Sequence, residues 1–222
     1  MHGLIKRIKE QNKPKSVFKI PINVYHSFEK TDLQYFIEKL EKILPSKAFK
    51  NLRQINVGKF QEFEDRNISA FSTDDQIFIS NELSLEHSLR ATVHEIAHLV
   101  ENEYFDLIYG DGSLESEFIG KRKHLYNFLR ADNKNPPSVR LFLNPRFSEK
   151  LDDFFYKEIG YDYLSTLNAK FGYGPTSYSL TSLSEYFADG FEYFFFEDVN
   201  ILKNTCPSLY NVLYSTLDTL ER

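Results

Sequence analysis

The stretch ATVHEIAHLVEN, residues 91–102, contains the pattern H-E-x-x-H as His94, Glu95 and His98. On a helix, side chains four residues apart lie one turn apart on the same face, so both imidazoles can reach one metal ion. The carboxylate of Glu95 then lies beside that ion. This pattern is typical of zinc peptidases, in which the histidines bind the metal and the glutamate acts as general base.

The residues around this pattern predict a helix over positions 85–103. At about 100° per residue, one apolar stripe forms on this helix, and the two histidines and the glutamate lie on the other side. A buried stripe with a separate reactive face favours a metal site over a pair of core histidines. The stripe consists of Leu89, Val93, Ile96 and Val100.

Length and charge limit the classes of function. A chain of 222 residues fits one domain, so we expect residues 1–222 to form a single catalytic domain and a monomer. The formal net charge of -5 argues against a nucleic-acid partner, which would require a concentrated basic surface. The single cysteine excludes an internal disulfide. No apolar run approaches the roughly 18 residues of a membrane span.

The N-terminal residues 1–15 are charged and predict a tail. They lack the apolar core of a signal peptide. A cytosolic chain, a mature fragment and a chain delivered by other means therefore all stay open.

The coarse pattern of elements predicts an α+β fold with a small mixed sheet and a largely helical C-terminal half. In the N-terminal half we expect a strand at 16–25, a helix capped by Thr31, a strand at 54–60, a polar loop and a strand at 75–80. In zinc peptidases a strand just before the metal helix can pair with an extended substrate. An ordinary edge strand is the alternative. In the C-terminal half we expect a helix at 114–129 and an extended stretch at 139–143.

A catalytic zinc site needs a third protein ligand besides the two histidines. The metzincin arrangement is excluded, because Glu101 and Tyr104 stand where that class has glycine and histidine. Asp106, in D-x-x-Y-G, is one candidate, although it follows His98 closely. Glu185 is the other candidate.

Glu185 lies in a predicted helix at 183–196 with an aromatic stripe on one face. Its acidic face consists of Glu185, Asp189 and Glu192. That face is either a source of metal ligands or a solvated surface. The aromatic stripe consists of Leu183, Phe187, Phe191 and Phe194.

Three stretches resemble one known family, the catalytic domain of anthrax lethal factor and the related Pro-Pro endopeptidases. The resemblance implies a zincin-like fold, a Zn²⁺ cofactor and endopeptidase activity on a protein or extended peptide, in a secreted or delivered enzyme. The stretches are HEIAH at 94–98, EYFADGFEYFF at 185–195 and NTCPSLYNVL at 204–213.

The same resemblance implies roles for individual residues. His94, His98 and Glu185 match the zinc ligands, and Glu95 matches the general base. Tyr178 matches a tyrosine that precedes the ligand glutamate by seven residues, and it can donate a hydrogen bond to the developing oxyanion. The acidic position one turn after the ligand glutamate is Asp189 here; it can orient a ligand imidazole.

One departure from the family concerns spacing. Residues 99–184, 86 in number, separate the second histidine from the ligand glutamate. This is longer than the resemblance predicts, so residues 105–170 are a candidate inserted helical subdomain. Pro-Pro specificity therefore does not carry over. Two other functions stay open: a catalytically silent or regulatory binding protein of the same fold, and a regulatory peptidase that acts inside the cell.

Overall fold

The computed structural model describes residues 16–66 and 68–222, which form two compact units. The first unit extends to Leu99 and the second begins at Val100. The boundary falls inside the continuous helix α4 (Leu85–Glu103). The expected tail, residues 1–15, lies outside the described residues. That the whole chain is one catalytic domain, with an insertion at 105–170, stays a prediction.

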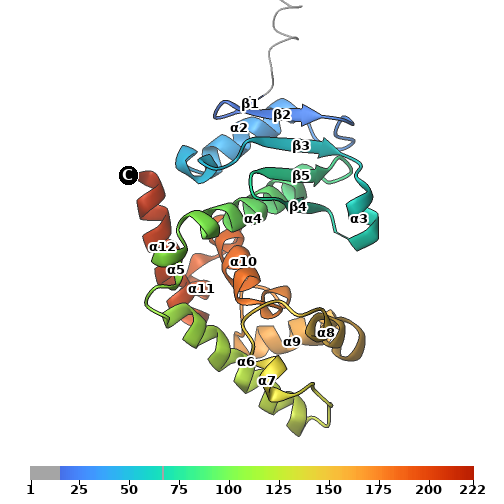
Figure 1. Ribbon diagram of the computed structural model, residues 1–222, viewed down its shortest axis with the longest axis vertical. Helices are drawn as coiled ribbons and strands as arrows, with labels where there is room; N and C mark the ends of the chain where they lie inside the picture. The colour runs from blue at the N-terminus through green and yellow to red at the C-terminus, as the bar shows by residue number, and fades with distance from the viewer. Residues whose placement is uncertain (1–15, 67) are drawn as a thin grey trace, which may run out of the picture. The chain divides into compact units, whose positions relative to one another are not determined.

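The first unit contains a five-stranded mixed sheet (Figure 1). The strand order is β1-β2-β3-β5-β4, with parallel pairing in β2-β3-β5 and antiparallel pairing at both ends. The strands are β1 (Ser16–Val17), β2 (Ile20–Val24), β3 (Gln54–Gly58), β4 (Ala70–Ser72) and β5 (Gln76–Ser80). The other elements are α2 (Leu33–Ile43), the 3-10 helix η1 (Ser46–Phe49), α3 (Gln61–Arg66) and most of α4.

Strand register explains the apolar face of this sheet. Ile22, Ile55 and Ile77 align across β2, β3 and β5, and all three are buried. Because side chains alternate along a strand, the neighbouring positions point to the opposite face. There Asn56 donates hydrogen bonds to Gln76 Oε1 and to the main chain of β5. The sheet therefore has one hydrophobic face and one face that carries amides.

Two predictions near the N-terminus are wrong. Residues 16–25 form a hairpin and not one strand, because Phe18 and Lys19 turn the chain with φ of 44° and 71°. A two-residue turn with positive φ matches the twist of antiparallel strands. The cap of α2 is Asp32, whose side chain accepts a hydrogen bond from Tyr35 N, and not Thr31.

The polar loop expected before residue 75 is also wrong, because α3 and β4 lie there. Strand β4 pairs antiparallel with β5, and the ring of Phe71 stacks on Phe78 at 4.6 Å between centroids. Strand β5 is therefore an interior strand, and β4 is the edge of the described sheet. A three-residue strand is too short to show a period of two.

Helix α4 confirms the predicted bounds and the predicted stripe. Leu89, Val93, Ile96 and Val100 are all buried, with at most 6% exposure.

The described part of the second unit is helical, with no strand among residues 100–222. The helix expected at 114–129 is confirmed as α6 (Ser113–Ala131). The extended stretch expected at 139–143 is wrong, because Ser138 Oγ caps a short helix, α7 (Val139–Phe142). The remaining elements are α5 (Phe105–Tyr109), α8 (Glu149–Asp153), the π-helix η2 (Phe154–Ile159), α9 (Tyr161–Phe171), the 3-10 helix η3 (Tyr178–Leu180), α10 (Leu183–Phe196), α11 (Val199–Thr205) and α12 (Pro207–Glu221).

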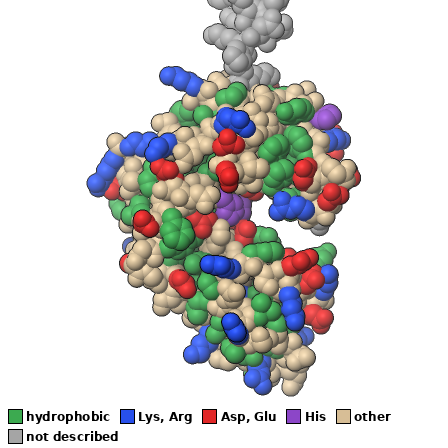
Figure 2. Space-filling view, viewed as in Figure 1, with side chains coloured by type: hydrophobic (Ala, Val, Ile, Leu, Met, Phe, Trp, Pro, Cys, Tyr) green, Lys and Arg blue, Asp and Glu red, His purple; other side chains and the backbone are tan. Residues whose placement is uncertain are grey.

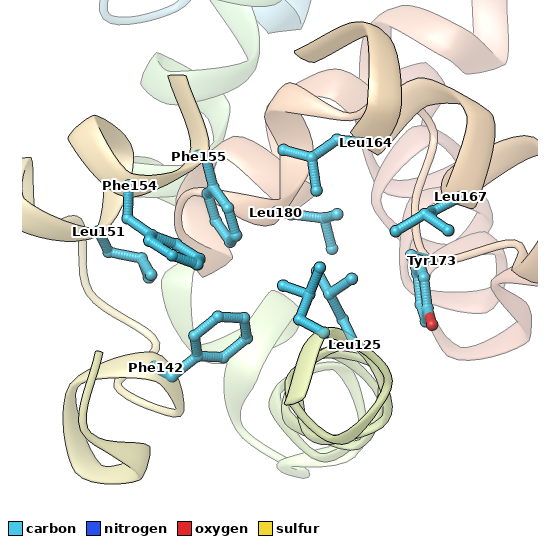
Figure 3. Close-up of a cluster of buried hydrophobic side chains, with 10 residues drawn as sticks. Leu125, Phe142, Leu151, Phe154, Phe155, Leu164, Leu167, Tyr173 and Leu180 are labelled. Atoms are coloured by element: carbon cyan, nitrogen blue, oxygen red, sulfur yellow. The ribbon is translucent and has the colours of Figure 1, made fainter. Parts of the chain in front are cut away.

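Helix α10 packs against α6 and α12. Gly190 lies where α10 closely approaches α12, since a Cβ there would lie 2.6 Å from Leu209 Cδ2 and would displace that side chain. A cluster of buried hydrophobic side chains joins α6, α7, α8, η2 and α9 (Figure 3). Its members include Leu125, Phe142, Leu151, Phe155 and Leu164.

The predicted α+β class, with a small mixed sheet and a helical C-terminal half, is confirmed. None of the described helices is long and apolar enough to span a membrane. On the face of each unit that Figure 2 displays, Lys and Arg side chains are interspersed with Asp and Glu.

Candidate metal centre and active site

The two histidines of the H-E-x-x-H pattern lie one turn apart on α4. Their ring centroids are 5.1 Å apart with the planes at 78°, and both side chains are partly exposed. Helical pitch alone brings them together. His94 and His98 therefore lie clear of the buried stripe, as the periodicity predicts.

Glu95 is buried, at 9% exposure, whereas His94 and His98 are partly exposed. Its Oε2 accepts a hydrogen bond of 2.7 Å from Ser72 Oγ on β4. Sequence reasoning did not identify Ser72, since a serine in a polar segment carries no distinguishing signal. The bond holds one carboxylate oxygen in place and so orients the other.

Strand β4, beside this glutamate, has an edge that pairs with no other strand among residues 16–66 and 68–222. Thr73 N donates to Gln76 O at 2.8 Å, and Ser80 N donates to Ser69 O at 2.9 Å. In an antiparallel ladder, alternate residues bond to the partner strand, so the main-chain groups of Ala70 and Ser72 point away from β5. The edge strand next to Glu95 is thus β4, and not the strand at 75–80.

In the second unit, α10 carries Glu185 in its first turn. The helix begins with a capping sequence, in which Ser182 Oγ accepts a hydrogen bond from Glu185 N at 3.1 Å. The pattern S-x-x-E at 182–185 is visible in the sequence and marks this start. The cap fixes the backbone from which the glutamate projects.

The first turn of α10 is joined to the last turn of α4. Ser184 Oγ donates a 2.6 Å hydrogen bond to Glu101 Oε2, and both residues belong to the second unit. Glu101 follows His94 by seven residues, so it lies on the same face of α4 as the two histidines. The face of α4 that carries the two histidines thus ends at Glu101, which contacts Ser184, the neighbour of Glu185.

Asp189 lies one turn after Glu185 and is 5% exposed. It accepts a short hydrogen bond from Thr176 Oγ1. The hydroxyl of Thr176 in turn accepts from Ser179 N at 3.1 Å, and its carbonyl accepts from Ser179 Oγ at 2.6 Å. The hydrogen bond between Thr176 and Asp189 therefore holds the turn that carries Tyr178 against α10.

Tyr178 itself lies in η3 and is 41% exposed. The centroid of its ring lies 6.0 Å from the centroid of the Tyr161 ring. The hydroxyl of Tyr161 donates a hydrogen bond to Asp152 Oδ1 at 2.8 Å. Burial, followed by the bond to Asp152, raises the pKa of Tyr161 above the usual value. Tyr161 therefore stays protonated and supports one side of the Tyr178 ring.

Side chains that could hold a metal ion stand on both helices. Helix α4 offers His94 and His98, and α10 offers Glu185, Asp189 and Glu192. Imidazole and carboxylate groups are the donor set that suits zinc, although other divalent metals also accept it. The alternative ligand Asp106, exposed on α5, belongs to no group of metal-binding side chains among the described residues.

Comparison with protein families, with curated proteins and with solved structures finds no match to this chain.

Proposed function

We propose that this chain is a zinc-dependent endopeptidase of the lethal-factor-like, zincin type, in which His94, His98 and Glu185 hold the ion. One observation carries the proposal: a single helix presents both histidines on one face, and that face ends at Glu101, which is bonded to Ser184 beside Glu185. Two imidazoles and a carboxylate supply three protein ligands, and a catalytic site keeps the fourth position for water or substrate.

When bound, zinc supplies a Lewis acid that lowers the pKa of water and polarises a carbonyl group. Glu95 accepts the proton of the attacking water and later delivers it to the leaving amine. The hydrogen bond from Ser72 keeps the carboxylate in one orientation for both transfers. Burial of Glu95 limits competing contacts with bulk water.

The free edge of β4 supports an extended peptide as the substrate. The outward main-chain groups of Ala70 and Ser72 can pair with a peptide strand, which supplies affinity without regard to side chains. Because Ser72 also contacts Glu95, a peptide on this edge is held next to the general base.

Tyr178 is the proposed donor to the oxyanion that forms as water attacks the carbonyl. The contact between Asp189 and Thr176 makes Asp189 a positioning residue for the Tyr178 turn. That Asp189 orients a ligand imidazole stays a prediction.

The decisive experiment compares the wild-type chain with Glu95→Gln. Metal content is measured after dialysis, and cleavage is profiled on a proteome-derived peptide library. We expect about one zinc ion per chain in both proteins and cleavage by the wild type alone. Equal cleavage by both proteins would refute the assignment of the base.

Zinc without cleavage would instead indicate the catalytically silent binding protein. A regulatory peptidase that acts inside the cell is distinguished from a secreted one by its target. Library peptides from cytosolic proteins would favour the first, and peptides from secreted proteins would favour the second.

A further inference from the structure

Basic residues are concentrated in one segment of the second unit. Residues 120–147 hold seven Lys or Arg and one Asp, a formal charge of +6, although the whole chain has a formal net charge of -5. The rest of the second unit, residues 100–119 and 148–222, holds five basic and 18 acidic residues. Such a charge asymmetry within one unit points to a surface that meets an anionic partner.

Two of the seven basic side chains make contacts inside the unit. Lys121 Nζ donates hydrogen bonds to main-chain carbonyls at the ends of α9 and α11. Arg122 is fully buried, and its guanidinium lies 5.1 and 5.5 Å from the ring centroids of Phe118 and Phe142. Its Nη1 donates to Asn144 O, just after α7, at 2.7 Å. Arg122 therefore holds α7 and the following loop against α6.

Four of the other five basic side chains are exposed where α6 meets α7. They are Lys123, Arg130, Lys134 and Arg140, and we call them the α6–α7 basic surface. Lys123 and Arg130 lie on one face of α6, since seven residues span almost two helical turns. Lys134 follows the end of that helix, and Arg140 lies on α7, which packs against α6 (Figure 1).

The turn after α6 fixes the position of Lys134. Asn133 adopts a φ of 57°, and Lys134 N donates to Leu129 O at 2.9 Å, which closes the helix end. The only acidic residue of the segment, Asp132, accepts a 2.8 Å hydrogen bond from the Tyr163 hydroxyl. The Lys134 ammonium lies 5.5 Å from the centroid of the same ring. Tyr163 therefore contacts both residues and holds the turn in place.

None of the four cations forms an ion pair with any residue in the described ranges, 16–66 and 68–222. Their charge is therefore available to a partner. Clusters of about four to eight basic side chains attract the anionic headgroups of phospholipids.

One apolar side chain is exposed beside these cations. Val139 precedes Arg140 on α7 and is 49% exposed. An apolar side chain next to cations suits the boundary between lipid headgroups and acyl chains. Nucleic acid fits less well, because the 18 acidic residues in the rest of the unit would repel an extended polyanion.

We propose that the α6–α7 basic surface attaches the chain to the surface of a membrane that contains anionic phospholipid. The headgroup phosphates pair with the four basic side chains, and Val139 reaches the boundary with the acyl chains. This attachment is independent of the proposed zinc site, so its test requires no cleavage.

The test is co-sedimentation of the full chain with vesicles of phosphatidylcholine, either alone or mixed with phosphatidylglycerol. We expect the wild type to bind only the anionic vesicles, and to be released when salt rises from about 0.1 M to about 1 M. Replacing all four residues of the basic surface by Gln should weaken binding at least about a hundredfold, since each contributes about fivefold. The Tm of each variant checks the fold.

A matched control removes the same number of charges elsewhere in the second unit. It combines Lys150→Gln, Lys157→Gln, Lys170→Gln and Lys203→Gln, since all four side chains are exposed. Binding of this variant should change less than about tenfold, because charges far from the membrane are screened. Val139→Ser should weaken binding about threefold through the loss of apolar contact.

Equal binding to both kinds of vesicle, equal loss in the two fourfold variants, or no binding to anionic vesicles overturns the proposal. A double-stranded DNA oligonucleotide is tested in parallel. If the wild type binds this DNA and not the vesicles, and the first variant loses that binding, the surface belongs to a nucleic-acid site and the membrane proposal is wrong.

Discussion

The two units contribute to the proposed site in different ways. The first unit supplies His94, Glu95 and His98 from five consecutive positions of one helix, so their spacing follows from helical pitch. The second unit supplies Glu185 and Tyr178 from separate elements, which a cap and a set of side-chain hydrogen bonds hold together. The relative positions of the three residues on α4 therefore follow from the helix itself. The positions of Glu185 and Tyr178 depend on contacts that a single substitution can remove.

The largest expected effect tests whether the second unit is needed to hold the metal. Glu185→Ala should lose the zinc that survives dialysis and should reduce cleavage below detection, as His98→Ala should. Metal analysis and peptide cleavage check this, with Glu197→Ala as an exposed control just beyond α10. Full zinc content in Glu185→Ala would show that the two histidines suffice, and that α10 plays no part in metal binding.

The next effect concerns chemistry within the first unit. Glu95→Gln should lower kcat about a thousandfold, because the amide cannot accept the proton, while zinc content and Tm stay unchanged. Glu86→Gln, an exposed residue in the first turn of the same helix, is the control and should keep full activity. A similar loss in both variants would point to damage to the helix and not to a missing base.

Tyr178→Phe should lower kcat about a hundredfold with little change in KM, since the hydroxyl acts mainly in the transition state. Steady-state kinetics separate the two constants. Tyr163→Phe removes a hydroxyl that donates to Asp132 and serves as the control. An effect confined to KM would assign Tyr178 to substrate binding.

Thr176→Val tests the network that distinguishes the second unit. It removes the hydroxyl that bonds to Asp189, so kcat should fall about tenfold while zinc content is retained. In the Tyr178→Phe background the same change should have almost no further effect, because both act through one hydroxyl. Additive losses in this double-mutant cycle would separate the turn from the tyrosine.

The smallest effect is on stability. Arg122→Met replaces a buried guanidinium by an apolar side chain of similar length, so the free energy of unfolding should rise by about 1 kcal/mol. Denaturant unfolding measures this, with the exposed Arg130→Met on the same helix as control. A loss of stability would mean that the ring contacts and the bond to Asn144 outweigh the cost of burial.

Long elements with a clear period were predictable from the sequence. The bounds and the buried stripe of α4, and the position of α6, follow from apolar residues at helical spacing. Short elements were not. Strand β4 has three residues and α7 has four, too few for any period to appear, and both depend on their neighbours.

The same division applies to the site residues. The H-E-x-x-H pattern and the S-x-x-E cap before Glu185 are local and readable. Ser72 and Thr176 carry no local signal, since a hydroxyl can serve many purposes on a surface. Their contacts with Glu95 and Asp189 appear only after distant segments come together.

By itself, then, the sequence determined the face of α4 that carries His94 and His98, the helical nature of the second unit and the candidate ligands, because a helix converts spacing directly into geometry. Only the tertiary structure decided that β4 is the edge strand, that Asp189 holds the Tyr178 turn and that α7 packs against α6. These features arise from contacts between residues far apart in the chain, and such contacts depend on packing that no local pattern encodes.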